Sequence, residues 1–91
     1  MTFRISLHRD ARKFLERVQR PQRERIVAAL RALEDDPFTA RSGADIKRLH
    51  GVRGRQDLYR LRMGKFRAVY AVEGDEVLVT EIWERGHGYD I

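Results

Sequence analysis

The sequence predicts a small α+β domain: a short N-terminal strand, an antiparallel hairpin of two helices, and then an antiparallel meander of three to four strands. Three observations lead to this prediction. The chain has 91 residues, which suits a single domain over residues 1–91. Apolar residues recur at helical spacing through residues 11–33, and they alternate with polar residues through much of residues 58–72.

The first third of the chain carries one strand pattern and two helix patterns. Apolar and polar residues alternate over residues 3–7, as in a strand with one buried face. Apolar residues then recur at i, i+3, i+4 and i+7 in two sets: Ala11, Phe14, Leu15 and Val18, and Ile26, Ala29, Leu30 and Leu33. Pro21 suits the first turn of the second helix, and Pro37 ends it. Because only Gln19 and Arg20 separate the helices, we expect an antiparallel helical hairpin.

The rest of the chain carries strand patterns separated by loops and glycine turns. We expect up to four strands: Ile46–Leu49, Leu58–Met63, Phe66–Val72 and Val77–Trp83. Residues 38–44 and Gly51–Arg55 are predicted to be connections. Gly64-Lys65 fits a type II′ hairpin turn, which has glycine first, and Gly74-Asp75 is a second tight turn. The helices are expected to cover one face of the sheet and leave the other open to solvent.

Composition excludes several classes of protein. There is no cysteine, so neither a disulfide nor a thiolate zinc site is possible. The N-terminal residues lack the apolar run of a signal peptide, and the longest mostly apolar stretch, Val77–Trp83, is too short to span a bilayer. These features predict a cytoplasmic protein that does not act at a membrane.

The net charge of +5 is unevenly distributed. Residues 1–33 carry nine basic and three acidic residues, and residues 37–72 carry nine basic and two acidic residues. Residues 73–91 carry six acidic residues and one arginine. A basic body of this kind attracts polyanions such as nucleic acids, because each neutralised phosphate releases counterions. The alternative is an ordinary solvated surface, since helices commonly carry arginine and glutamate on their exposed faces.

The familiar catalytic and metal-binding patterns are missing. The histidines at positions 8, 50 and 87 do not have the spacing of metal ligands, and no glycine-rich phosphate loop precedes a helix. Four carboxylates fall in or beside the last hairpin, where solvated turn acids are the simplest interpretation: Glu73, Asp75, Glu76 and Glu81. We therefore expect no metal and no cofactor.

Arginines on the central strands are the candidate site. Arg60 and Arg62 are two residues apart on one predicted strand, so both side chains leave the same face. A turn at Gly64-Lys65 would place Arg62 directly opposite Arg67, and like charges in that position destabilise a sheet. A bound anion would offset the repulsion. The alternative is surface decoration in an arginine-rich protein.

The C-terminal stretch adds three further candidates: Arg85, His87 and Tyr89. A tyrosine can stack on a nucleic-acid base while an arginine holds the phosphate. The alternative for Tyr89 is packing of a terminal aromatic ring on the core. The simplest interpretation of His87 is a solvated loop residue, with an auxiliary role as the second possibility.

Residues 57–70, read as Asp-Leu-Tyr-Arg-Leu-Arg-Met-Gly-Lys-Phe-Arg-Ala-Val-Tyr, resemble the central strands of the RelE/ParE toxin superfamily. Arg85 with Tyr89 four residues later is similar to the C-terminal pair of that family. The helical hairpin and Leu49-His50-Gly51 also fit, and the short tail is most similar to archaeal-type members. The resemblance covers nearly the whole chain and implies a RelE-like fold.

The resemblance implies the toxin of a type II toxin–antitoxin system. RelE-type toxins are mRNA interferases that inhibit translation: they cleave messenger RNA in the ribosomal decoding site by attack of a 2′-hydroxyl on the adjacent phosphate. A RelB-like antitoxin would be the partner. By position, five residues match the catalytic set of the family: Arg60, Arg62, Arg67, Arg85 and Tyr89.

One departure and two alternatives accompany the resemblance. Some bacterial members carry lysines at the positions of Arg60 and Arg62, and arginine hardly ever gives up its proton. Protonation of the leaving group would then fall to His87, to water or to the ribosome. The alternatives are a ParE-like inhibitor of DNA gyrase, which binds protein without catalysis, and a degenerate toxin that only binds its antitoxin.

Overall fold

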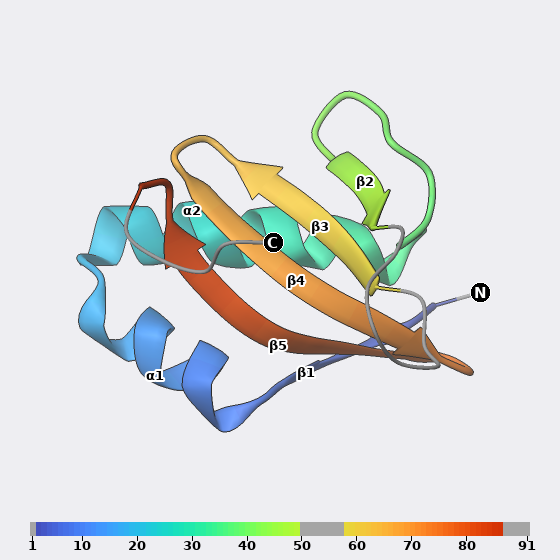
Figure 1. The fold of residues 1–91 in the computed structure, drawn as a ribbon, viewed down its shortest axis with the longest axis horizontal. Helices are drawn as coiled ribbons and strands as arrows, with labels where there is room; N and C mark the ends of the chain where they lie inside the picture. The colour runs from blue at the N-terminus through green and yellow to red at the C-terminus, as the bar shows by residue number, and fades with distance from the viewer. Residues whose placement is uncertain (1, 50–57, 87–91) are drawn as a thin grey trace.

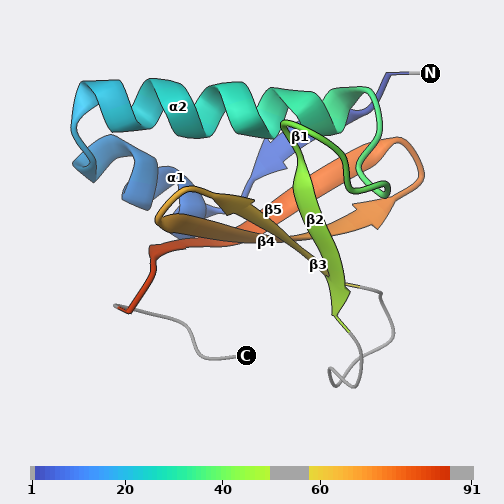
Figure 2. The same ribbon diagram turned by 90° about the horizontal axis from the view of Figure 1, so that it is seen from above.

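A computed structural model describes residues 2–49 and 58–86 of the chain. The predicted α+β architecture is confirmed: two helices lie on one face of a five-stranded sheet (Figures 1 and 2). In chain order the elements are β1 (Arg4–Leu7), α1 (Arg9–Arg17), α2 (Arg20–Arg31), a single 3-10 turn η1 (Ala32–Glu34), β2 (Asp45–Leu49), β3 (Leu58–Met63), β4 (Phe66–Glu73) and β5 (Glu76–Glu84). Within these residues no helix has the length and apolar character needed to cross a membrane.

The sheet is mixed rather than wholly antiparallel. The meander was predicted to have three to four strands and has four, β2 to β5; the spatial order of the sheet is β1-β5-β4-β3-β2. The N-terminal strand joins at the far edge and runs parallel to β5, with Arg4 opposite Glu76 and Leu7 opposite Val79. Parallel neighbours need a long crossover connection, and here both helices and the rest of the meander lie between the two strands.

The β3–β4 hairpin has the predicted register. Met63 lies opposite Phe66, and Arg62 lies opposite Arg67. Gly64, the first residue of the turn, has a positive φ of +64°, whereas Lys65, the second, does not, because no described residue other than glycine has a positive φ. A type II′ turn requires this combination. The predicted turn and the cross-strand arginine pair are both confirmed.

A β-bulge in β5 changes which of its residues face the core. Val69 lies opposite Glu81 but Tyr70 lies opposite Val79, so Thr80 is an extra residue, and its hydroxyl donates to the Val69 carbonyl at 3.3 Å. Val77 and Val79 are therefore buried before the bulge, and Ile82, rather than Glu81, is buried after it. Simple alternation along Val77–Trp83 does not predict this change of face.

The core lies between the helices and one face of the sheet. The two helical stripes bury Ala11, Leu15, Ile26, Leu30 and Leu33. They pack against sheet residues that include Leu61, Phe66, Ala68, Tyr70, Val77, Val79 and Ile82. Each fully buried leucine or isoleucine contributes about 1.5–3 kcal/mol relative to an exposed one, so both stripes are needed to fix the helices on a sheet this small.

An arginine holds the corner between the two helices. α1 runs toward the end of the molecule from which α2 returns (Figure 2). Arg23, in the first turn of α2, donates from Nε to the Leu15 carbonyl at 2.7 Å and from Nη2 to the Val18 carbonyl at 2.9 Å. Both carbonyls lie at the C-terminal end of α1, where backbone carbonyls have no partner within the helix. The predicted helical hairpin is therefore fixed by hydrogen bonds as well as by packing.

Tyr70 connects the sheet to the loop that follows η1. Its hydroxyl donates to the Pro37 carbonyl at 2.7 Å, and its ring stacks on Tyr59 with centroids 5.5 Å apart. Burial, followed by the neighbouring Tyr59, raises the pKa of the Tyr70 phenol, so it stays a hydrogen-bond donor. Tyr70 is therefore a structural tyrosine.

We expect Tyr70→Phe to lower the free energy of unfolding by about 1–3 kcal/mol, because the Pro37 carbonyl loses its buried donor. Urea denaturation followed by circular dichroism measures the change. Tyr59→Phe is the control, since it removes a neighbouring hydroxyl without breaking this contact. Equal midpoints for the wild type and Tyr70→Phe would show that the hydrogen bond does not stabilise the fold.

Candidate functional site

The face of the sheet away from the helices carries the predicted arginines. Leu61, Phe66 and Ala68 point into the core, so the alternating residues Arg60, Arg62 and Arg67 point to the other face. Val69, directly opposite Arg60, is only 2% exposed although it is not part of the core cluster. Val69 is thus a buried apolar neighbour of Arg60 on the face that carries the arginines.

Three other arginines act electrostatically on Arg67. Desolvation by burial is the largest cause that lowers the pKa of the Arg67 guanidinium. Three positive charges lower it further, in the order Arg62, Arg85 and Arg60. The structure therefore brings together four of the five predicted site residues, and we call Arg60, Arg62, Arg67 and Arg85 the arginine cluster.

The β3–β4 turn positions two members of the cluster. Arg67 donates from Nη1 to the Gly64 carbonyl at 2.9 Å and to the Phe66 carbonyl at 3.1 Å. The backbone N–H of Arg85 donates to the Lys65 carbonyl at 2.6 Å, immediately after the end of β5. Main-chain carbonyls of one turn therefore hold both residues, which limits how far Arg67 can swing away from its neighbours.

The cluster contains an acidic residue that the sequence analysis did not single out. Asp45 begins β2 and lies opposite Arg62. Its Oδ1 is 3.9 Å from Arg60 Nη2, and its Oδ2 is 3.7 Å from Arg62 Nε. Four arginines and one aspartate leave the cluster with a net charge of +3. The ion pairs with Asp45 therefore reduce the excess positive charge without removing it.

Arg60 keeps an unused donor. Its side chain is 23% exposed, and its Nε is buried without a hydrogen-bond partner. A buried donor that lacks a partner costs about 1–3 kcal/mol. An anion that drew the guanidinium into a new position would supply that partner, so the orphaned Nε is consistent with a site made for a ligand.

The register also places Trp83 beside the cluster. It is the single tryptophan of the chain and lies directly opposite Arg67 on β5. The sequence gives no signal for this placement, because the register of β5 against β4 depends on the bulge at Thr80. Tyr89 and His87 lie outside the described residues, so their roles remain predictions.

The remaining candidates have structural roles or lie outside the site. His8 caps α1 by accepting from the Asp10 N–H at 3.3 Å. Glu76 accepts from the Ser6 hydroxyl, and Asp75 pairs with Arg4 at 3.3 Å. In residues 2–49 and 58–86, no group of three histidine or acidic side chains is arranged to hold a metal ion.

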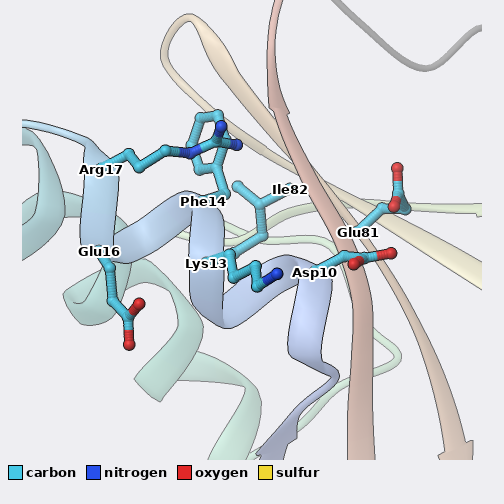
Figure 3. Close-up of a pocket in the computed structure, with 7 residues that line it drawn as sticks. All are labelled: Asp10, Lys13, Phe14, Glu16, Arg17, Glu81 and Ile82. Atoms are coloured by element: carbon cyan, nitrogen blue, oxygen red, sulfur yellow. The ribbon is translucent and has the colours of Figure 1, made fainter.

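A separate cavity of about 340 Å³ lies between α1 and β5 (Figure 3). Its lining comprises Asp10, Lys13, Phe14, Glu16, Arg17, Glu81 and Ile82. The lining combines three acidic and two basic side chains with Phe14 and Ile82, and no member of the arginine cluster takes part. This mixed lining does not favour a phosphate, in contrast to the open face of the sheet.

The fold agrees with comparisons to known proteins. A family model described as the ParE toxin of the type II toxin–antitoxin system parDE matches residues 5–89. The chain belongs to this toxin family, within the RelE/ParE superfamily. None of the curated proteins compared with the chain matches it.

Two solved structures are similar to this RelE/ParE toxin. One is the archaeal RelE–RelB complex from Pyrococcus horikoshii OT3, with a TM-score of 0.78 and 29% identity over 97% of this chain and 100% of that chain. The other is the RelB–RelE antitoxin–toxin complex from Methanococcus jannaschii, with a TM-score of 0.67 and 22% identity over 87% of this chain and 88% of that chain. The second likeness shows the fold alone. The predicted RelE-like fold is confirmed.

We expect the arginine cluster to bind single-stranded polyanions, and Trp83 fluorescence to report the binding. The logarithm of the binding constant should fall with the logarithm of salt concentration by about 0.7 for each phosphate neutralised. Arg62→Ala should therefore reduce the slope by about 0.7. Arg12→Ala, an equal charge change on the exposed side of α1, is the control. Equal slopes for both variants would place the polyanion elsewhere.

Proposed function

We propose that this type II toxin is a RelE-like endoribonuclease that cleaves messenger RNA in the ribosomal decoding site. The arginine cluster is the observation that carries the proposal. Repelling guanidinium groups on one sheet face lower the stability of the free protein, and a bound phosphodiester offsets that cost. The 29% identity to the RelE–RelB structure from Pyrococcus horikoshii supports the same assignment.

The proposed reaction is an in-line transphosphorylation. The 2′-hydroxyl loses its proton and attacks the adjacent phosphorus, and the bond from phosphorus to the 5′-oxygen breaks. The products are a 2′,3′-cyclic phosphate and a 5′-hydroxyl. Negative charge accumulates on the non-bridging oxygens in the transition state, where fixed guanidinium groups stabilise it.

The cluster arginines supply charge rather than protons. Arginine remains protonated in proteins, so Arg60 and Arg62 stabilise the transition state but cannot act as general acids. Tyr89 would stack on a base or accept the 2′-hydroxyl proton, and His87, water or the ribosome would protonate the leaving oxygen. Cleavage would then depend on the ribosome to shape the substrate.

A RelB-like antitoxin is the proposed protein partner. The similar toxin from Pyrococcus horikoshii was solved in a RelE–RelB complex. The basic surface of this chain suits an acidic amphipathic segment. A largely apolar groove of about 310 Å³ between α2 and the β3–β4 turn, lined by residues that include Arg25, Met63, Lys65 and Phe66, offers such a segment both apolar and charged contacts.

We expect Arg67→Ala and Arg85→Ala each to reduce cleavage of a defined message on translating ribosomes by about 100-fold, since each removes a transition-state charge. Tyr89→Ala should also lose cleavage. The measurement is primer extension, with chemical analysis of the ends for a cyclic phosphate. Arg12→Ala should cleave like the wild type. Undiminished cleavage in all three site variants would contradict the proposal.

Inhibition of DNA gyrase is the second candidate function, favoured by the match to the ParE family model. It would act by protein binding without catalysis. We expect the wild type to leave gyrase supercoiling unaffected at concentrations that cleave ribosome-bound message. Inhibition of supercoiling without RNA cleavage would establish the gyrase function instead. Absence of both activities and of growth arrest would indicate a chain that only binds its antitoxin.

A further inference from the structure

We propose that Asp45 is a positioning residue, which holds Arg60 and Arg62 in the orientation that receives the scissile phosphate. This inference rests on the proposed ribonuclease function. It assigns a role to an acidic side chain inside an otherwise basic cluster, at a place where simple charge attraction to RNA would disfavour one.

The geometry places Asp45 between the two arginines. Asp45 is on β2, while Arg60 and Arg62 are two residues apart on β3 and point to the same face. One carboxylate oxygen lies 3.9 Å from Arg60 Nη2, and the other lies 3.7 Å from Arg62 Nε. Each oxygen therefore attracts a different guanidinium, and one side chain orients both.

The arginines need such an anchor because they repel each other. Arg62 faces Arg67 across the hairpin, and Arg60 adds to the positive charge around Arg67. Backbone carbonyls restrain Arg67, whereas Asp45 is the carboxylate that pairs with Arg60 and Arg62 in the described part of the chain. Without it, the half-exposed Arg62 side chain and the guanidinium end of Arg60 would be less ordered, and ordering them would be left to the substrate.

The length of the ion pairs leaves the arginines available. Separations of 3.7 and 3.9 Å exceed hydrogen-bond distance, so the guanidinium donors are attracted to Asp45 without being used by it. The carboxylate is also 57% exposed, so water and salt weaken the pairing enough for a phosphate to compete. Asp45 thus organises the free site and gives up part of its interaction when RNA binds.

Separate measurements of kcat and of RNA binding test the inference. We expect Asp45→Asn to lower kcat for ribosome-bound message by about 10-fold or more, because the arginines are no longer preorganised. The same variant should bind a non-cleavable 2′-O-methyl oligonucleotide as tightly as the wild type or more tightly, because a negative charge is gone. Asp45→Glu should restore much of the lost kcat. The shape of the pH profile should stay unchanged, since the proposed role transfers no proton.

The control and a second measurement separate positioning from net charge. Glu73→Gln makes the same charge change at the exposed end of β4, outside the cluster, and should leave kcat within about twofold of the wild type. Side-chain Nε–Hε NMR signals of Arg60 and Arg62 should shift in Asp45→Asn but not in Glu73→Gln. This readout needs no catalysis.

Two failures are distinguishable. If the wild type cleaves no message, the proposed ribonuclease is wrong, and the catalytic part of this inference is wrong with it. If the wild type cleaves and Arg67→Ala does not, an undiminished kcat in Asp45→Asn overturns the role of Asp45 alone. Unshifted Arg60 and Arg62 signals in Asp45→Asn would likewise overturn it.

Discussion

The two-residue turn at Gly64-Lys65 is the constraint on which the rest of the site depends. It fixes the β3–β4 register with Met63 opposite Phe66 and Arg62 opposite Arg67. Side chains alternate between faces, so slipping β3 by one residue against β4 would exchange the core and solvent positions of β3. Burial of Leu61 and Phe66 under the helices therefore also keeps the arginines on the opposite face of the sheet.

The same turn connects the fold to the chemistry. The Gly64 carbonyl accepts a hydrogen bond from the Arg67 side chain, and the Lys65 carbonyl accepts one from the Arg85 backbone. One residue of β4 and one that follows β5 are therefore both held at this turn. The free energy that opposes this arrangement is electrostatic, and it is offset in three ways: by apolar burial on the helix side, by the carbonyl contacts of Arg67, and by Asp45. Repulsion between the arginines destabilises one face of the sheet, and apolar packing against the helices on the other face of the same strands offsets it.

Local pattern was sufficient to predict most of the fold, because its signals lie within short windows. Helical stripes, the glycine-first turn and the alternation in Leu58–Met63 each involve neighbours in sequence, and each is confirmed. The pairing of β1 with β5, the bulge at Thr80 and the position of Asp45 opposite Arg62 depend instead on contacts between distant segments. Nothing local sets the register between β2 and β3, because residues 50–57 separate them. Arg60, Arg62 and Arg67 could therefore be placed together along one hairpin, whereas the position of Asp45 beside them could not be predicted.

The physical character of the open face bears on the choice between two functions that share one scaffold. A surface that only docks onto a protein gains most from apolar and aromatic contacts at its centre, with charges toward the rim. Here the hairpin instead places two arginines directly opposite each other, with two more positive charges near enough to lower the pKa of Arg67. Docking through apolar contacts alone gives no reason to retain that repulsion. The proposed phosphodiester substrate would give one, because the negative charge of its transition state would accumulate beside the guanidinium groups. The orphaned Nε of Arg60 adds to this argument, since a donor left without a partner in the free protein becomes useful when an anion arrives.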